Sequence, residues 1–352
     1  MRFWVSPNPI RVEVEPDITL QDTRFRPATP SRVRLLVFLY HVTQGATYPV
    51  ISNQFGIGIS TVSKCIHDCT QYILLRMYRQ YIRLPSREEA ARNMENWRAQ
   101  TGIPGIVAAI DGTHISIKKP NVDGEVYFNR KHFYSLNVQG TLFAIAFGFF
   151  ANRVLGVVDF KKRFIDIEVG WPGSVGDGRI WQNSVLSSHH KVWLSEFPTF
   201  ALATGPHREE QVPAFILADS AYPNTKNMVT TFKNTELNSN RTIRKLNAKL
   251  GAARYHVENA FGIMKMRFQL FKKPLECSVE DARIAIYLTS AIFVLHNFLI
   301  DVKDSTTVDP EEQWIHDQMV PNHEDVVQDQ DEDESTRHVL IRHMEYLLSE
   351  DD

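Results

Sequence analysis

The sequence predicts a mixed α/β domain that follows a helical module. Residues 32–84 place apolar side chains at the spacing of α-helices, and short β-type runs begin near residue 105. Helical patterns return at 252–270 and 279–300. Strands followed by helices indicate a layered domain with one buried core, and a chain of 352 residues that is 43% hydrophobic has enough material for it.

This pattern divides the chain into four parts. Residues 1–30 are expected to form a poorly ordered lead-in, 31–104 the helical module, 105–301 the α/β domain, and 302–352 a flexible acidic tail. No stretch approaches the roughly 20 apolar residues of a membrane helix, so no membrane contact is expected. Three cysteines are too few for a disulfide framework and fit a reducing compartment.

The charge is unevenly distributed along the chain. Residues 301–352 hold 17 acidic residues against 3 basic ones, a formal charge of −14, whereas residues 1–300 carry +12. A basic body with an acidic tail is typical of a protein that contacts nucleic acid. The alternative is an ordinary solvated tail on a body without that function.

Residues 47–69 predict a helix-turn-helix. Pro49 suits the first turn of a helix that ends at Phe55. Gly56 and Gly58 allow the tight turn that follows, and Ser60 is expected to cap the second helix.

In such a motif the second helix enters the major groove of DNA. Val62 and Ile66 are expected to face inward. The candidate DNA contacts are therefore Thr61, Ser63 and Lys64. The alternative is a plain helical hairpin that only packs on the next domain.

Two aspartates follow apolar strands. Asp111 comes after the run 106–110, and Asp219 comes after 215–218. A carboxylate at the end of a buried strand is costly unless it meets water or holds a cation, and hard divalent cations prefer carboxylate oxygens. The two residues therefore predict a metal site, with an ordinary strand-terminal turn as the alternative for each aspartate alone.

Glu258 is the third candidate. It borders the buried stripe of an amphipathic helix and is expected to face the sheet. Arg254, one turn earlier, allows a surface ion pair instead. Two strand aspartates and a helix glutamate are the set that a two-metal phosphodiester enzyme needs. Asp111, Asp219 and Glu258 are thus the expected catalytic residues, with Mg²⁺ or Mn²⁺ as the cofactor.

Six ordered segments resemble the motifs of PIF/Harbinger-type DDE transposases. They are AAIDGTHISIKKP, YFNRKHFYSLNVQ, RFIDIEVGWPGSVGDGRIWQNS, LADSAYP, RYHVENAFGIMKMRF and AIFVLHNFLI. The resemblance covers residues 85–301, and the helix-turn-helix ahead of it also resembles the family's amino-terminal region.

The resemblance implies a ribonuclease-H-like catalytic domain in which Asp111, Asp219 and Glu258 hold metal ions. It adds Asp177, in GWPGSVGD, as a further metal ligand. Gly176 stands where family members often have His, so no histidine can act at that position.

The resemblance also implies partners and a location. The expected partners are DNA, a Myb-like protein that assists DNA binding and nuclear entry, and further copies of the same chain. The expected location is the nucleus, shared with the cytoplasm. Asn129, Arg130 and Lys131 are candidates for contact with DNA phosphate, and a solvated loop is the equal alternative.

One departure from the family is large. Family members pass from NVQ almost directly into VVDFKKRFIDIEVGWPG, whereas residues 140–156 stand between these segments here. Connections of 2–5 residues are usual between neighbouring strands, so this insert is expected to be unnecessary for folding. It either extends the two flanking strands into a longer hairpin or exposes an apolar patch that promotes aggregation. A chain that joins Gln139 to Val157 is expected to be at least as stable as the full chain.

The sequence therefore predicts a metal-dependent DNA endonuclease or transposase that hydrolyses phosphodiester bonds at transposon ends. One alternative is a domesticated DNA-binding protein that no longer cuts DNA. A second alternative is a metallohydrolase of small phosphate esters, which would not bind DNA.

Overall fold

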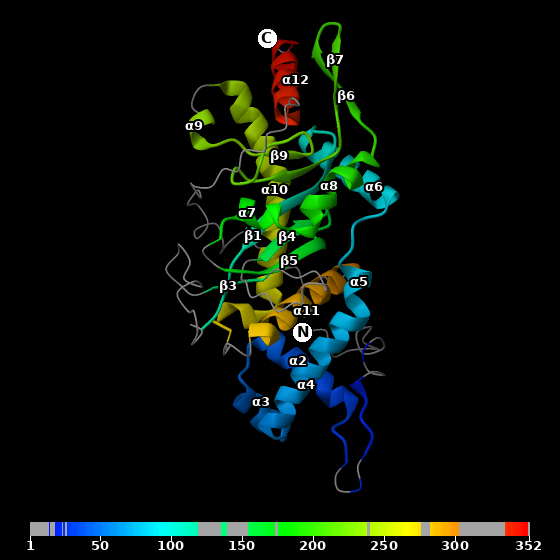
Figure 1. Cartoon of the computed structure of the whole chain (residues 1–352), viewed down its shortest axis with the longest axis vertical. Helices are drawn as coiled ribbons and strands as arrows, with labels where there is room; N and C mark the ends of the chain where they lie inside the picture. Colours follow the sequence, from blue (N-terminus) through cyan, green and yellow to red (C-terminus); the bar gives the residue numbers. More distant parts are fainter. Residues whose placement is uncertain are drawn as a thin grey trace. The chain divides into compact units, whose positions relative to one another are not determined.

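The chain divides into two compact units, which are described separately. The first joins Met1–Ile82, Ile115–Ser135 and Ile263–Ser305, and the second joins Arg83–His114, Leu136–Gly262 and Thr306–Asp352. The computed structural model (Figure 1) describes residues 14, 18–22, 24, 27–118, 135–138, 154–172, 175–237, 240–275, 282–302 and 335–350.

The first unit is mainly helical. Its elements are α2 (Ser31–Gln44), α3 (Tyr48–Phe55), α4 (Ile59–Tyr72), the π-helix η1 (Ile73–Met77), α5 (Tyr78–Tyr81), the short strand β2 (Ile115–Ser116), the 3-10 helix η4 (Gln269–Lys272) and α11 (Ala282–Asp301). α2 packs on α3 and α4, and α11 packs on α4, η1 and α5.

α3 and α4 form a two-helix hairpin at the place that the sequence predicts. Gly56 ends α3 with φ 63°, a conformation that favours glycine. Val62 and Ile66 are buried as expected. The prediction of a Ser60 cap is wrong, because α4 begins at Ile59 and the extended residue before it is Gly58.

α11 corrects the expectation that no stretch is long and apolar enough to cross a membrane. Its window Ile284–Asp301 meets that test by length and composition, and 67% of the window is buried inside the structure. A buried core helix passes the same test. Asn297 of this helix donates a hydrogen bond to the carbonyl oxygen of Tyr81, at 2.7 Å, as a core residue would.

The second unit is a layered α/β domain. Its elements are α6 (Arg87–Thr101), β1 (Ile106–Thr113), β3 (Ser135–Val138), β4 (Val154–Val158), β5 (Phe164–Pro172), α7 (Asp177–Gln182), α8 (Val185–Ser195), β6 (Phe200–Gly205), β7 (Arg208–Val212), β8 (Phe215–Ala218), β9 (Met228–Thr230), α9 (Asn234–Leu237), most of α10 (Arg241–Arg267), and α12 (Thr336–Glu350).

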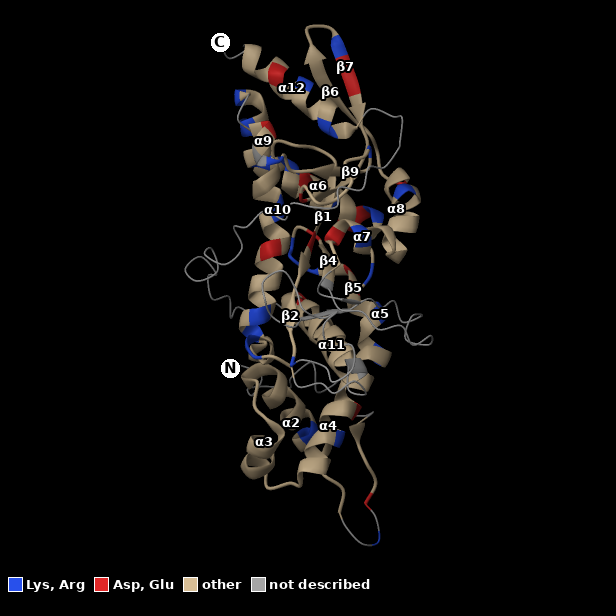
Figure 2. Cartoon of the chain, turned by 60° about the vertical axis from the view of Figure 1, so that its left-hand side comes forward, with Lys and Arg blue, Asp and Glu red and all other residues tan. Residues whose placement is uncertain are grey.

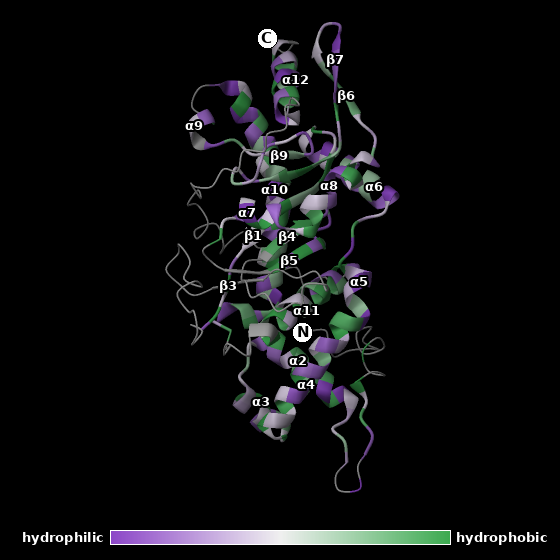
Figure 3. Cartoon of the chain, viewed as in Figure 1, coloured by the Kyte–Doolittle hydropathy of each residue, from purple (hydrophilic) through white to green (hydrophobic). Residues whose placement is uncertain are grey.

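Six of its strands form a mixed sheet in the order β3-β5-β4-β1-β8-β9, and β6 and β7 form a separate antiparallel pair. β1 pairs antiparallel with β4 and parallel with β8, and β9 continues the parallel part beyond β8. The central strands are largely hydrophobic (Figure 3). This arrangement confirms the predicted mixed α/β class and is consistent with a ribonuclease-H-like domain.

Helices cover both faces of the sheet. On one face, Ile110 and Leu155 join an apolar cluster with residues of α6, α7 and α8. On the other face, Phe261 of α10 lies over Gly156, where an added Cβ would come within 2.7 Å of the Phe261 ring. Because side chains alternate along a strand, Asp111 points to the α10 face, opposite to Ile110.

The structure moves the boundary of the predicted insert. Residues 154–156, the last three of the predicted segment 140–156, begin β4, which lies between β1 and β5. Gly156 pairs with Asp111 of β1 and with Ile167 of β5. These three residues belong to the sheet and not to a connection, so the expectation that the whole segment is unnecessary is wrong. Residues 139–153 lie outside the described residues.

Joining Gln139 directly to Val157 is therefore expected to destabilise the second unit instead of leaving it unchanged. The deletion removes Leu155, which is 1% exposed, and loss of a buried leucine side chain alone costs about 2–5 kcal/mol. Urea unfolding measures the loss. The matched control deletion replaces residues 139–153 with a six-residue Gly/Ser linker, because β3 and β4 lie on opposite sides of β5 and a direct join cannot span it. It keeps β4 whole and is expected to retain the urea midpoint of the full chain. Equal destabilisation by both deletions would contradict the boundary at Val154.

α12 corrects the prediction that residues 302–352 are a flexible tail. Val339, Leu340 and Met344 are 2–7% exposed, and the helix packs on β6, β7 and β9. The acidic composition of the preceding residues conceals this helix, although Leu340, Met344, Leu347 and Leu348 recur at helical spacing. Residues 303–334, which hold most of the acidic charge, lie outside the described residues.

The first turn of α12 holds the connection between β8 and β9. Asn224 Nδ2 donates to Ser335 Oγ, and Thr336 Oγ1 donates to the carbonyl oxygen of Lys226, both at 2.6 Å. Further along α12, Arg342 forms an ion pair with Glu210 of β7. The carboxyl-terminal helix is thus fixed to the segment that follows Asp219.

Candidate metal centre

Asp111 lies near the end of β1, after five buried residues. Its Oδ1 accepts a hydrogen bond from the backbone N–H of Gly112 at 2.8 Å, and its Oδ2 accepts one from Arg254 Nη1 at 3.1 Å. The side chain is 13% exposed. A carboxylate at this position is therefore largely dehydrated and held by a fixed arginine.

Asp219 lies beside Asp111 because their strands are parallel neighbours. β8 ends at Ala218, and the carboxyl ends of parallel strands meet at one edge of a sheet. Asp219 Oδ1 accepts a hydrogen bond from the backbone N–H of Ala221 at 2.8 Å, which turns the chain away from the sheet. The sequence predicts that these two aspartates belong to one metal site, and their positions at the same edge of the sheet agree with that prediction.

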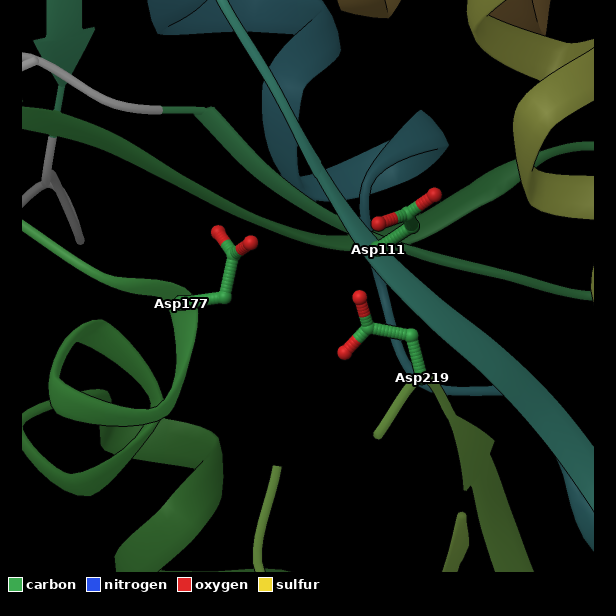
Figure 4. Close-up of side chains that lie close together, drawn as sticks. All are labelled: Asp111, Asp177 and Asp219. Carbon is green, nitrogen blue, oxygen red and sulfur yellow. The ribbon is translucent and has the colours of Figure 1, made fainter. Parts of the chain in front are cut away.

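Asp177 completes a group of three carboxylates. It is the first residue of α7 and is 3% exposed. One carboxylate oxygen from each of Asp111, Asp177 and Asp219 lies within 4.8 Å of the others. Figure 4 shows the three side chains converging from three different elements. Three carboxylates this close repel one another, so the arrangement is unfavourable without a cation.

Glu258 does not belong to this closest group. It pairs with Arg254 one turn earlier on α10, and the same arginine binds Asp111, so Arg254 stands between the two acids. Burial raises the pKa of Glu258, Arg254 lowers it, and the nearby charges of Asp111 and Asp219 raise it further, with a net increase. The ion pair with Arg254, which the sequence left as one alternative, is present, and the Glu258 side chain is 33% exposed. A role of Glu258 in holding metal stays a prediction.

Arg254 is the residue of the site that the sequence analysis undervalued. Burial lowers its pKa, but the charges of Asp111, Glu258 and Asp219 outweigh that effect and raise it. The four-residue spacing to Glu258 predicts that ion pair. The bond to Asp111 joins residues 143 positions apart in the sequence, and no local pattern could reveal it.

The three aspartates fit a hard divalent cation. Mg²⁺ binds oxygen ligands at 2.0–2.1 Å, so two ligands of one ion lie at most about 4.2 Å apart. The oxygens of Asp111, Asp177 and Asp219 lie within 4.8 Å, and a small rotation of one side chain would close the difference. The donor set contains only carboxylates, which suits Mg²⁺ or Mn²⁺.

The predicted DNA contacts are only partly described. Ser63 and Lys64 are exposed on α4, and Thr61 is half-buried. Asn129, Arg130 and Lys131 lie outside the described residues. DNA contact by any of the six stays a prediction.

Comparison with known proteins supplies the family. The family model of DDE superfamily endonucleases matches residues 110–297, just over half of the chain. "Putative nuclease HARBI1" of Bos taurus is 26% identical over 303 residues, which are 82% of this chain and 75% of that protein, and the Homo sapiens protein of the same name gives the same values. "Protein ALP1-like" of Arabidopsis thaliana is 22% identical over 81% of this chain and 64% of that protein. No solved structure matches the chain.

The matched region contains most of the sheet and the acidic residues Asp111, Asp177, Asp219 and Glu258. It begins one residue before Asp111 and ends after Glu258, within α11. The resemblance that six sequence motifs indicated is therefore confirmed. The chain belongs to the DDE superfamily endonucleases.

Proposed function

We propose that the chain is a divalent-metal-dependent endonuclease that hydrolyses DNA phosphodiester bonds, and that its substrate is the DNA at transposon ends. The supporting observation is the group formed by Asp111, Asp177 and Asp219, whose carboxylate oxygens lie within 4.8 Å of one another. The group occurs in a domain of the DDE endonuclease family, whose reaction needs such a donor set.

The protein's contribution to this reaction is to hold and orient charged groups. Asp111, Asp177 and Asp219 would hold the cation, with Mg²⁺ or Mn²⁺ suited to carboxylate ligands. Arg254 fixes the carboxylates of Asp111 and Glu258 on the α10 face of the sheet. When bound, divalent cations supply an activated water and neutralise the leaving oxygen. None of the carboxylates needs to form a covalent bond with the substrate.

The proposal includes DNA binding and partners. Thr61, Ser63 and Lys64 of α4 would contact DNA, as the second helix of a helix-turn-helix does, and the exposure of Ser63 and Lys64 supports this contact. Arg34, by contrast, is buried against Asp68 and adds nothing to this surface. A Myb-like partner, a homo-oligomer and a nuclear location belong to the same proposal and rest on the family resemblance.

Cleavage of DNA tests the proposal. The full chain is expected to nick or cut duplex DNA that carries element ends when Mg²⁺ or Mn²⁺ is added, and to stop when EDTA is added. Asp219→Asn is expected to lower the rate by roughly 10³-fold or more, because a charged ligand is lost at the reacting centre. Salt-sensitive DNA binding without any cleavage would favour a domesticated DNA-binding protein. Hydrolysis of small phosphate esters without DNA binding would favour the metallohydrolase.

A further inference from the structure

The amino-terminal half of α10 carries a row of cations without acidic neighbours. Arg241, Arg244 and Lys245 are exposed, and Lys249 is half-buried. The sequence from 241 to 257 contains no Asp or Glu. Figure 2 shows blue Lys and Arg segments on α10 toward α9. We call Arg241, Arg244, Lys245 and Lys249 the α10 cation row.

These cations share one side of the helix. Residues 241, 245 and 249 are spaced by four, and residue 244 lies on the same side, so the four side chains form one stripe. Leu246, Leu250 and Ala253 are 0–2% exposed and mark the opposite side, which is packed in the core. The stripe therefore faces outward at Arg241, Arg244 and Lys245, and it ends at the half-buried Lys249, whose amine lies beside Gly102 at the end of α6.

The α10 cation row makes no ion pair within the described part of the chain, unlike other cations of the second unit. Arg337 pairs with Glu236, Arg342 with Glu210, and Arg163 with Asp159. A row of uncompensated cations attracts a polyanion, and its counterions are released when phosphates replace them.

The row leads along the same helix to the candidate metal centre. From residue 241 to Glu258 the helix rises about 25 Å at 1.5 Å per residue, the length of roughly seven base-pair steps of 3.4 Å. The next cation on the helix, Arg254, is already committed to Asp111 and Glu258. A cluster of acids repels DNA phosphate, so a DNA strand near the site needs attraction from a surface close beside it.

We infer that the α10 cation row binds the phosphate backbone of the DNA that enters the metal centre. This inference rests on the proposed nuclease function and names a binding surface for it. The row holds phosphates beside the site without reading bases, because lysine and arginine contacts to the backbone carry no sequence information directly. The helix then places Glu258 and Arg254 at a fixed distance from the bound strand.

The test compares two double variants of the full chain on a short DNA duplex, in buffer that contains EDTA so that no cleavage occurs. Arg244→Gln/Lys245→Gln removes two charges from the row. Arg92→Gln/Arg98→Gln removes two exposed charges from α6 and is the matched control. The row variant is expected to raise Kd roughly 10-fold and to reduce the slope of log Kd against log salt by about 2. The control is expected to change Kd less than 2-fold, and thermal melting checks that both variants fold.

The outcomes separate this inference from the nuclease proposal. A row variant with the Kd and salt slope of the control overturns the inference, even if the wild-type chain cuts DNA. A selective loss of binding by the row variant supports the inference, even if no metal ion supports cleavage and the nuclease proposal fails. If the wild-type chain shows no salt-sensitive DNA binding at all, both are overturned.

Discussion

Replacing Asp177 with Asn is expected to weaken Mn²⁺ binding by roughly 100-fold or more and to stop DNA cleavage. Replacing Glu258 with Gln is expected to leave the affinity for the first Mn²⁺ ion nearly unchanged. Loss of a group that only supports a ligand already costs about 10–100-fold in metal affinity, so loss of a ligand should cost at least as much. Asp177 belongs to the group of three oxygens within 4.8 Å, and Glu258 does not.

The same substitution should stabilise the protein when no metal is present. Asp177 is 3% exposed and lies beside two other carboxylates, so removing its charge relieves repulsion in a poorly hydrated place. We expect a gain of about 1 kcal/mol in the free energy of unfolding, a typical size for relief of strain at a functional site. A metal-binding residue thus has a signature that a purely structural residue lacks: its loss lowers metal affinity and raises metal-free stability.

Calorimetric titration with Mn²⁺ and thermal melting in EDTA measure the two effects. Asp177→Asn keeps the size of the side chain, and Glu258→Gln is the matched control on the other side of Arg254. If Glu258→Gln abolishes metal binding and Asp177→Asn does not, the first cation is held by the predicted catalytic set Asp111, Asp219 and Glu258 and not by the three aspartates that the structure brings together. Equal losses would indicate that both acids bind the first cation.

The sequence was sufficient to find Asp111 and Asp219, because each follows an apolar run long enough to mark a buried strand. In the structure they lie close together because β1 and β8 are parallel neighbours that end at one edge of the sheet. Asp177 could not be found in this way. It starts a helix of only six residues, directly after Gly176, and only the family resemblance singled it out.

The two wrong boundaries have a common physical cause. Contacts with other strands determine where β4 and α12 begin, and the local sequence pattern does not contain those contacts. Residues 154–156 look like the end of an apolar insert, but their pairing with β1 and β5 makes them part of the sheet. Residues 336–350 look like the end of an acidic tail, but α12 buries three apolar side chains against distant strands. β1 is distant in the sequence from residues 154–156, and β6, β7 and β9 are distant from α12, so composition alone gave the wrong boundary.

Truncating the chain after residue 334 is expected to destabilise the second unit by roughly 5 kcal/mol. Val339, Leu340 and Met344 would be lost, and burial of each such side chain contributes about 1.5–3 kcal/mol. Domains are stable by only about 5–15 kcal/mol, so the truncated chain is expected to be partly unfolded at 37 °C. Urea unfolding measures the loss, and the control His338→Gln/Glu345→Gln changes only exposed residues of α12. Retention of full stability after truncation would contradict a packed α12.

A smaller change separates the support of the metal centre from the support of the fold. Ser335→Ala/Thr336→Val removes the hydrogen bonds to Asn224 and Lys226 but leaves the apolar side of α12 in place. Each lost bond costs about 1 kcal/mol, so the protein should remain folded. The connection that begins at Asp219 would then be less firmly held, and we expect Mn²⁺ affinity to fall several-fold while affinity for DNA in EDTA stays the same. An unchanged Mn²⁺ affinity, with the expected small loss of stability, would mean that α12 supports the fold and has no influence on the position of Asp219.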